Sequence, residues 1–158
     1  MRDSAPETLS RAGEMLLQYG QFVLEHAGVC HFGSLDAEAA RLPESYLEQG
    51  GGCLLAWDGE TAAGFVAWRA LPAIDGGRSW EMKRLWVGPA ARGRGLGRIL
   101  TEAVIERATA AGQQALFLNT APEFMPAAQR IYRQLGFLPC PSQDRDPFPG
   151  IVWLRKAL

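Results

Sequence analysis

The sequence predicts a single α/β domain of the α+β type, built around a mixed and mostly antiparallel sheet. Two apolar segments, Cys53 to Trp57 and Ala62 to Ala70, flank the dipeptide Asp58-Gly59, a pattern typical of a β-hairpin. From Trp80 to Thr120 a strand, a helix and a second strand follow, and a right-handed crossover makes such strands parallel. With 158 residues, 47% of them hydrophobic, residues 1–158 fit one domain with a sizeable core.

The N-terminal part predicts two helices ahead of the hairpin. The first is expected from Pro6 to His26, with Tyr19 and Phe22 in the core. A shorter one is expected from Leu35 to Tyr46, with an interruption at Pro43.

The remaining elements follow from apolar periodicity between glycine and proline breaks. We expect a loop before the strand that starts at Trp80, which becomes the third antiparallel neighbour, and a polar loop before the last strand. The expected ranges are Leu71 to Ser79 (loop), Trp80 to Val87 (strand), Gly95 to Ala111 (helix), Gln114 to Thr120 (strand), Ala127 to Leu135 (helix), Phe137 to Cys140 (strand), Pro141 to Gly150 (loop) and Ile151 to Leu154 (strand).

A basic, glycine-rich turn joins the strand to the helix in this central unit. Its residues are Arg92, Gly93, Arg94, Gly95, Leu96, Gly97 and Arg98. Glycines let a ligand approach the backbone, and the first turn of a helix offers unpaired N–H groups and a positive dipole end. The turn therefore predicts a site for a phosphate or pyrophosphate.

Two familiar phosphate-binding motifs do not match this turn. A Walker A loop requires Gly-Lys-Ser/Thr after four intervening residues, and the chain has no such run. A Rossmann fingerprint requires G-x-G-x-x-G and a later acidic residue. Here the glycines run G-x-G-x-G, and Ala115 to Asn119 contains no acidic residue.

Charge and cysteine content limit the class of protein. The net charge is −1, which argues against a nucleic-acid binder that uses the arginine patch. The three cysteines, Cys30, Cys53 and Cys140, are widely spaced and odd in number, as expected for free thiols in a reducing compartment. We expect a cytoplasmic protein without a membrane segment, a signal peptide or a metal site.

The glycine-rich turn resembles the acyl-CoA signature of the GNAT (GCN5-related) N-acetyltransferases, Arg/Gln-x-x-Gly-x-Gly/Ala. Arg92, Gly95 and Gly97 fill its positions. A second block, AAQRIYRQLGF at Ala127 to Phe137, is similar to the later motif of the family, a helix that ends in Tyr-x-x-x-Gly-Phe. Both blocks have the right order and spacing, and the clear match covers Trp80 to Pro139.

The resemblance implies the GNAT fold and an acyltransferase. That fold has six to seven strands, a splayed parallel pair at the centre of the sheet and about four helices on both faces. The implied reaction transfers acetyl from acetyl-CoA to a primary amine on a small molecule or a peptide, by direct attack in a ternary complex. Dimers are common among members of the family.

The resemblance also implies where acetyl-CoA binds. The glycine-rich turn, from Arg92 to Gly97, holds the pyrophosphate through backbone N–H groups, with Arg92 and Arg94 assisting, and Arg98 adds positive charge. A bulge splays the preceding strand from its parallel neighbour, and Leu85, Trp86 and Val87 offer backbone groups to the pantetheine arm and to the oxyanion.

Further contacts are implied on the second strand and the last helix. Asn119 and Ala128 stand where the family often contacts the pantetheine or the adenine end. The family commonly has an asparagine early in this helix, whereas this chain has Pro126 to Gln129, and Gln129 is the substitute. Tyr132 fills the tyrosine position whose phenol donates to the CoA sulfur; the alternative is a core tyrosine.

Glu81 is the candidate general base. Its place on the strand resembles the glutamate of the GCN5-type histone acetyltransferases, and an apolar surrounding would raise its pKa. The alternatives are a salt bridge with Lys83 or Arg84 and proton removal through ordered water. In the family the first helices border the acceptor site, so Tyr19 or Phe22 could line it. The loop from Pro141 to Gly150 is an exposed linker or a flap over the acceptor.

A second function stays open. A protein with this fold could bind acyl-CoA as a sensor without turnover, and the departure at Pro126 to Gln129 is the reason to keep that possibility.

Overall fold

The computed structural model describes residues 6–27, 35–71, 74, 78–144 and 149–158. A six-stranded sheet forms its centre, and helices pack against both faces. The elements are α1 (Pro6–Ala27), α2 (Leu35–Ala40), α3 (Leu42–Tyr46), the 3-10 helix η1 (Leu47–Gln49), β1 (Gly52–Asp58), β2 (Thr61–Ala70), β3 (Ser79–Val87), the 3-10 helix η2 (Pro89–Ala91), α5 (Leu96–Ala110), β4 (Ala115–Thr120), α6 (Pro126–Gln134), β5 (Leu138–Cys140) and β6 (Val152–Ala157).

The sheet is mixed and mostly antiparallel, as the sequence predicts. Its strand order is β1-β2-β3-β4-β6-β5, and only β3 and β4 run parallel. The hairpin turns between Asp58 and Thr61, where Gly59 takes a left-handed conformation with φ 61°. The expected antiparallel trio and the parallel crossover pair are therefore both present.

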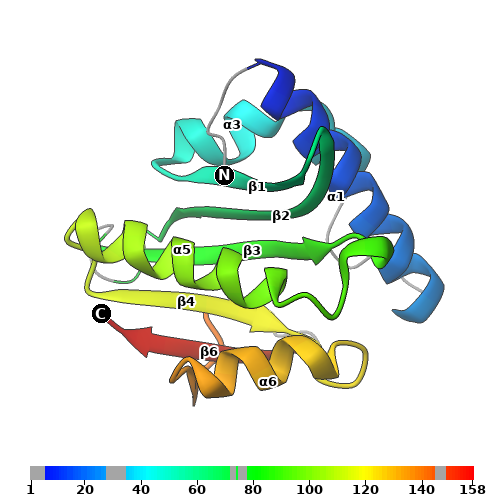
Figure 1. The fold of residues 1–158 in the computed structure, drawn as a ribbon. Coiled ribbons are helices and arrows are strands. Elements are labelled where there is room, and N and C mark those ends of the chain that lie inside the picture. Colours follow the sequence, from blue (N-terminus) through cyan, green and yellow to red (C-terminus); the bar gives the residue numbers. More distant parts are fainter. Residues whose placement is uncertain (1–5, 28–34, 72–73, 75–77, 145–148) are drawn as a thin grey trace.

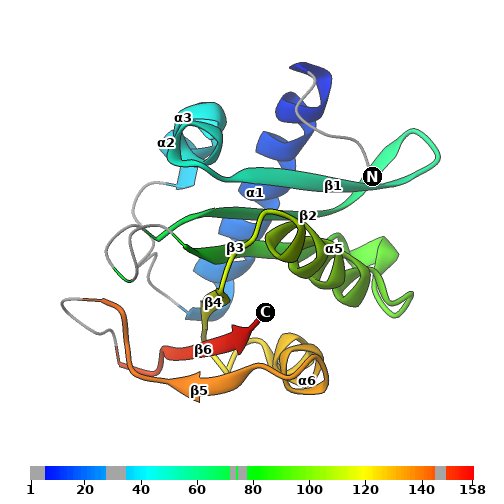
Figure 2. The ribbon, with the colours of Figure 1, turned by 90° about the vertical axis from the view of Figure 1, so that its left-hand side faces the viewer.

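Helices cover the two faces of the sheet unequally (Figures 1 and 2). In Figure 1, α5 and α6 lie in front of the sheet, whereas α1 lies behind it. One core cluster joins the apolar side of α1, including Leu16 and Val23, to Phe65 of β2. The other joins α5 and α6 to the opposite side of the sheet through Leu100 and Leu116. We call these two sides the α1 face and the α5 face.

The parallel pair separates soon after it starts. Ladder pairs join β3 and β4 only from Ser79–Ala115 to Glu81–Phe117, and Figure 1 shows the strands diverging beyond that point. A bulge in β3 accompanies the separation. It is recognised by the shift in the β2–β3 register between Phe65 and Ala67. The splayed pair implied by the resemblance is therefore present in this chain.

Two expected elements differ in detail. The helix expected from Leu35 to Tyr46 is two short helices, and the break falls at Arg41, so that Pro43 stands in the first turn of α3, where proline is tolerated. The last strand is longer than expected, since β6 continues to Ala157 beside β4. The middle of the expected loop from Pro141 to Gly150 lies outside the described residues. No described helix is both long and apolar enough to cross a bilayer.

Candidate active site

A cavity of about 620 Å³ lies beside the end of β3, where α5 begins and α6 passes. The end of β3, the glycine-rich turn, the start of α5 and one side of α6 form most of its wall, and α1 contributes two aromatic residues. The lining residues are Tyr19, Phe22, Leu85, Trp86, Val87, Ala91, Arg92, Gly93, Gly95, Leu96, Gly97, Arg98, Phe124, Met125, Pro126, Ala127, Ala128, Arg130, Ile131 and Gln134.

Glycine conformation shapes the turn at the mouth of this cavity. Gly93 and Gly95 have φ values of 76° and 78°, which side chains with a Cβ rarely adopt. Gly95 is the residue before α5, so the free N–H groups of the first helical turn lie beside the cavity. The arrangement suits an anion, because backbone donors and the helix dipole act at the same place.

The arginines of the turn take different places. Arg92 lines the cavity and lies over the Trp86 ring, with 4.8 Å between its guanidinium carbon and the ring centre, while its Nε donates to the Val87 carbonyl. Arg98 also lines the cavity and donates to Glu102. Arg94 instead forms an ion pair with Asp58 in the hairpin turn and is absent from the cavity wall.

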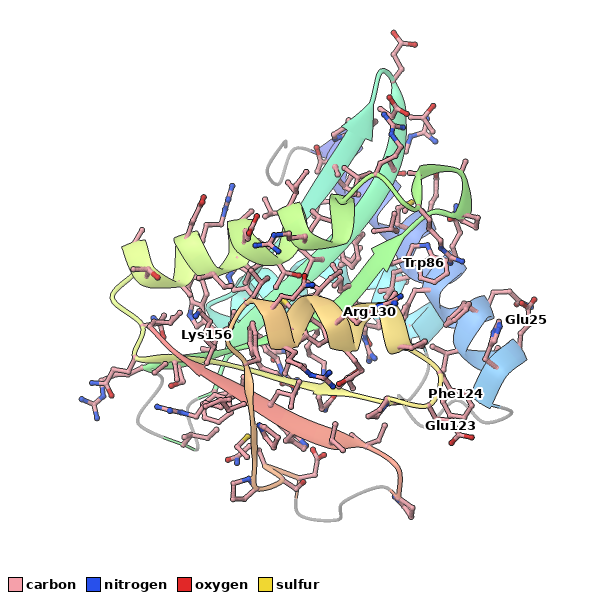
Figure 3. All side chains as sticks on the ribbon, turned by 60° about the horizontal axis from the view of Figure 1, so that its bottom comes forward. Glu25, Trp86, Glu123, Phe124, Arg130 and Lys156 are labelled. Carbon is pink, nitrogen blue, oxygen red and sulfur yellow. The ribbon has the colours of Figure 1, made fainter. Side chains whose placement is uncertain are left out.

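Sequence reasoning missed a cation on α6. Arg130 lines the cavity on the side opposite the glycine-rich turn, and Figure 3 shows it on α6, with Trp86 at the end of β3. The signal that could have found it is its spacing in the helix, four residues after Pro126 and three after Ala127, both of which line the cavity.

Aromatic side chains close the α1 side of the cavity. The ring centres of Phe22 and Trp86 lie 5.2 Å apart, and Tyr19 meets Trp86 edge-on at 6.1 Å. Tyr19 lies in the core, as predicted, since it is 6% exposed in the core cluster, and it also lines the cavity.

The backbone of β3 is open along the cavity. From Met82 to Val87, β3 has no ladder partner in β4, so its N–H and C=O groups on that side are free of strand pairing. Leu85, Trp86 and Val87, the three residues expected to meet pantetheine, line the cavity there.

Tyr132 lies one turn after Ala128 on α6, with its ring edge-on to Phe137 at 5.7 Å. Its side chain is buried in the core cluster of the α5 face and lines neither cavity, which matches the core-tyrosine alternative. Its hydroxyl has no hydrogen-bond partner in the part of the chain that the structure describes. Burial, and to a smaller degree the phenol of Tyr19, raise the pKa of Tyr132. The phenol is therefore protonated at neutral pH and able to donate.

A second, smaller cavity of about 20 Å³ adjoins the first, because Tyr19 and Met125 line both. We call it the inner cavity. It has room for about one water molecule, and its wall is polar. Its lining residues are Tyr19, Lys83, Arg84, Asn119, Thr120, Ala121 and Met125. Asn119 thus faces the inner cavity rather than the larger one.

Glu81 is almost fully buried between two cations. Its Oε1 accepts from Lys83 Nζ at 3.0 Å, and its Oε2 accepts from Arg69 at 2.8 Å. It lines neither cavity. This placement matches the salt-bridge alternative, with Lys83 as expected and Arg69 in place of Arg84.

Gln129 does not line either cavity. Its Nε2 donates to Thr120 Oγ1 at 2.9 Å, which ties the first turn of α6 to the end of β4. Ala128 does line the cavity, as the resemblance implies.

The model of the acetyltransferase (GNAT) family matches residues 20–137, most of the chain. The chain belongs to the GNAT family. A GNAT relative, an uncharacterized N-acetyltransferase of Schizosaccharomyces pombe, is 32% identical over 146 residues, which cover 92% of this chain and 86% of that protein.

Solved GNAT structures share the fold at low identity. An acetyltransferase of the GNAT family from Staphylococcus aureus superposes with a TM-score of 0.78 at 17% identity, covering 99% of this chain and 96% of the other. A phosphinothricin acetyltransferase from Sinorhizobium meliloti, solved in complex with acetyl-CoA, superposes with a TM-score of 0.76 at 20% identity, covering 99% and 86%.

This GNAT acetyltransferase has a cavity that suits acetyl-CoA. The open edge of β3 can pair with the amides of a pantetheine arm, and the α5 N-terminus can receive a pyrophosphate. No described residue that lines the larger cavity is an aspartate or a glutamate, so nothing there repels a polyanion.

Proposed function

We propose that this protein is an acyl-CoA-dependent N-acyltransferase, and that residues 1–158 act as one domain. It transfers acetyl from acetyl-CoA to a primary amine by direct attack in a ternary complex. The amine nitrogen forms a bond to the thioester carbonyl carbon, the C–S bond breaks, the sulfur leaves as thiolate and takes up a proton, and the nitrogen loses one. The products are an N-acetyl amide and CoA.

One observation carries this proposal: the left-handed glycine turn at the α5 N-terminus and the unpaired edge of β3 line the same cavity. An anion site beside an open strand edge fits a ligand that has a pyrophosphate at one end and an amide-bearing arm at the other. Within this proposal Gly93 to Gly97 bind the pyrophosphate, while Arg92, Arg98 and Arg130 add positive charge.

We assign two donors to the reacting thioester. Backbone N–H groups of Leu85 or Val87 stabilise the oxyanion as the amine attacks, because the splay leaves this edge without a strand partner. The Tyr132 phenol donates to the leaving sulfur, a role supported by its protonated state and its unpartnered hydroxyl.

We assign proton removal from the amine to ordered water rather than to Glu81, which lines neither cavity. Glu81 serves to hold Lys83 and Arg69, so Glu81→Gln should leave the acidic limb of the pH–rate profile in place. Loss of that limb in the variant would return Glu81 to the role of base.

We place the protein in the cytoplasm, with an amine compound rather than nucleic acid as its partner. Cys53 and Cys140 are both free thiols, whereas Cys30 lies outside the described residues. Free thiols fit a reducing compartment.

The first test compares two glycines at opposite ends of α5. Gly95 and Gly112 share a positive φ, 78° and 71°, and an added Cβ at either would meet nothing within 4 Å. Gly95→Asp and Gly112→Asp therefore carry a similar backbone strain of about 1–2 kcal/mol. Only Gly95 lines the cavity.

Gly95→Asp should weaken acetyl-CoA binding by more than about tenfold in calorimetry, since it sets a carboxylate against the pyrophosphate. Gly112→Asp should bind like the wild type. Equal binding by the two variants would refute a pyrophosphate site at this turn.

The second test separates an enzyme from a sensor. Tyr132→Phe should lower kcat for thiol release by about tenfold to a hundredfold while acetyl-CoA affinity stays the same, because the hydroxyl assists only the leaving group. The free energy of unfolding should change by less than about 0.5 kcal/mol, since the hydroxyl has no protein partner among the described residues. If both the wild type and Tyr132→Phe bind acetyl-CoA and neither acetylates an amine, the protein is a sensor.

A further inference from the structure

The inner cavity lies on the far side of the splay from the glycine-rich turn. Lys83 pairs with Ala67, which belongs to the core cluster on the α1 face, and Asn119 comes from the neighbouring strand β4. An acceptor that approaches the thioester from the α1 face would pass the wall of this cavity. The charge and hydrogen-bonding groups of its wall therefore indicate the chemical class of the acceptor.

The wall is cationic. Lys83 and Arg84 both line the inner cavity, and no described residue lining either cavity is an aspartate or a glutamate. Arg84 is matched by Glu38, whose carboxylate accepts from it at 3.0 and 2.8 Å. Lys83 and Arg69 instead share the one carboxylate of Glu81, so this trio keeps a net positive charge.

Lys83 has hydrogen-bonding capacity to spare. Its ammonium group carries three N–H donors. One of them forms a hydrogen bond to Glu81 Oε1 at 3.0 Å. The side chain is 14% exposed, so it is largely withdrawn from water. The side-chain amide of Asn119, on the same wall, has no partner among the described residues.

This wall disfavours a simple ammonium ion and favours an anion. A protonated amine would find cations rather than a carboxylate beside it, which lowers the pKa of the amine and promotes its reactive neutral form. A carboxylate on the same molecule would meet unused donors in a site of low dielectric constant, where charge-assisted hydrogen bonds are strong. The inner cavity adjoins the larger one and has room for one water-sized group, so one carboxylate oxygen that takes the place of a water would lie beside these donors.

We propose that the acceptor is an amine that also carries a carboxylate, an amino-acid-like molecule, and that Lys83 binds this carboxylate with help from Asn119. The proposal rests on the acyltransferase function above and adds the substrate class. Glu81, which is also paired with Arg69 and lines neither cavity, holds the Lys83 ammonium in place.

The experiment offers a panel of amino acids, each as the free carboxylate and as the uncharged primary carboxamide, together with polyamines. The wild type should prefer each free acid over its carboxamide by about tenfold or more in kcat/KM, the size of one charge-assisted hydrogen bond. Lys83→Met should remove this preference by lowering the rate on free acids, with the KM for acetyl-CoA unchanged, and Lys83→Arg should keep it.

Lys156→Met is the matched control. Lys156 pairs with Leu116, whose side chain belongs to the core of the α5 face, so the control removes the same charge on the other side of the sheet. Figure 3 shows Lys156 far from Trp86 and Arg130. It should keep the wild-type preference. Equal rates on acids and carboxamides, or a preference for polyamines, would overturn the proposal and leave the acyltransferase in place.

A binding measurement keeps the two proposals apart. Calorimetry of N-acetyl amino acids and their carboxamides, titrated into the protein with saturating CoA, reports on Lys83 without turnover. Tighter binding of the acids, lost in Lys83→Met, supports the inference even where no amine is acetylated, an outcome that would count against the function alone. Indifference to the carboxylate would overturn the inference.

Discussion

Arg84 occupies an unusual backbone position at the bulge of β3. Among the described residues it is the one non-glycine residue with a positive φ, 59°. Such a conformation costs about 1–3 kcal/mol and persists only where surrounding contacts hold it. Here a bidentate hydrogen bond to the Glu38 carboxylate holds Arg84, and the Tyr46 hydroxyl donates to the same carboxylate. A pair between α2 and β3 therefore supports the bulge that opens the cavity.

Glu38→Ala should lower the free energy of unfolding by about 3 kcal/mol, because it leaves Arg84 buried without its carboxylate. Urea denaturation measures the change. Adding Arg84→Gly to this variant should recover most of the loss, since glycine adopts the left-handed conformation freely and leaves no buried charge. A double variant no more stable than Glu38→Ala would show that Tyr46, not Arg84, accounts for the loss.

The same carboxylate predicts an acid dependence of stability. Burial alone would raise the pKa of Glu38, but the hydrogen bonds and charge of Arg84 outweigh it and lower the pKa below 4.5. Because the folded state favours the ionised form, its stabilisation is complete above the unfolded pKa and is lost as the pH falls through the folded pKa. Glu38→Gln should therefore show a smaller loss of unfolding free energy between about pH 5 and pH 3 than the wild type. An identical loss in the variant would contradict this.

At the scale of elements, α5 and α6 form two rims of the larger cavity. The gap between them depends on small residues: a Cβ added at Gly97 would lie 3.1 Å from Ile131 of α6. Ala127 also lines the cavity from the first turn of α6, and its side chain is exposed. A large side chain there should fill the cavity without disturbing the core.

Ala127→Trp should raise the KM for acetyl-CoA by about tenfold or more and leave the melting temperature nearly unchanged, because exposed positions tolerate substitution. Ala110→Trp at the exposed end of α5, outside the cavity wall, is the control and should behave like the wild type. Equal KM values in the two variants would place the ligand elsewhere.

At the scale of the whole molecule, both core clusters meet at the sheet that holds the cavity, so ligand binding should stabilise the entire fold. Acetyl-CoA at a hundred times its Kd should add about 2.7 kcal/mol. For a chain of 158 residues this corresponds to a rise of about 5–10 °C in Tm, in one cooperative transition. Two separate transitions, with only one responding to acetyl-CoA, would argue against a single domain.

Much of the fold was predictable because its signals are local. The Asp58-Gly59 turn marks the hairpin, the glycine-rich turn marks the start of α5, and helical spacing of apolar residues marks α5 and α6. The glycine-rich turn beside the cavity could be predicted for the same reason, since glycine conformation and free helical N–H groups depend on a few adjacent residues.

The tertiary structure decided the partners of the charged side chains. Arg94 turns to Asp58 in the hairpin, and Glu81 is held between Arg69 and Lys83, because ion pairing depends on distances between strands and not on sequence spacing. The bulge at Arg84 likewise depends on Glu38, 46 residues earlier in the chain. The sequence by itself thus determined the family and the glycine-rich turn of the larger cavity, whereas packing between distant elements determined the charged wall of the inner cavity.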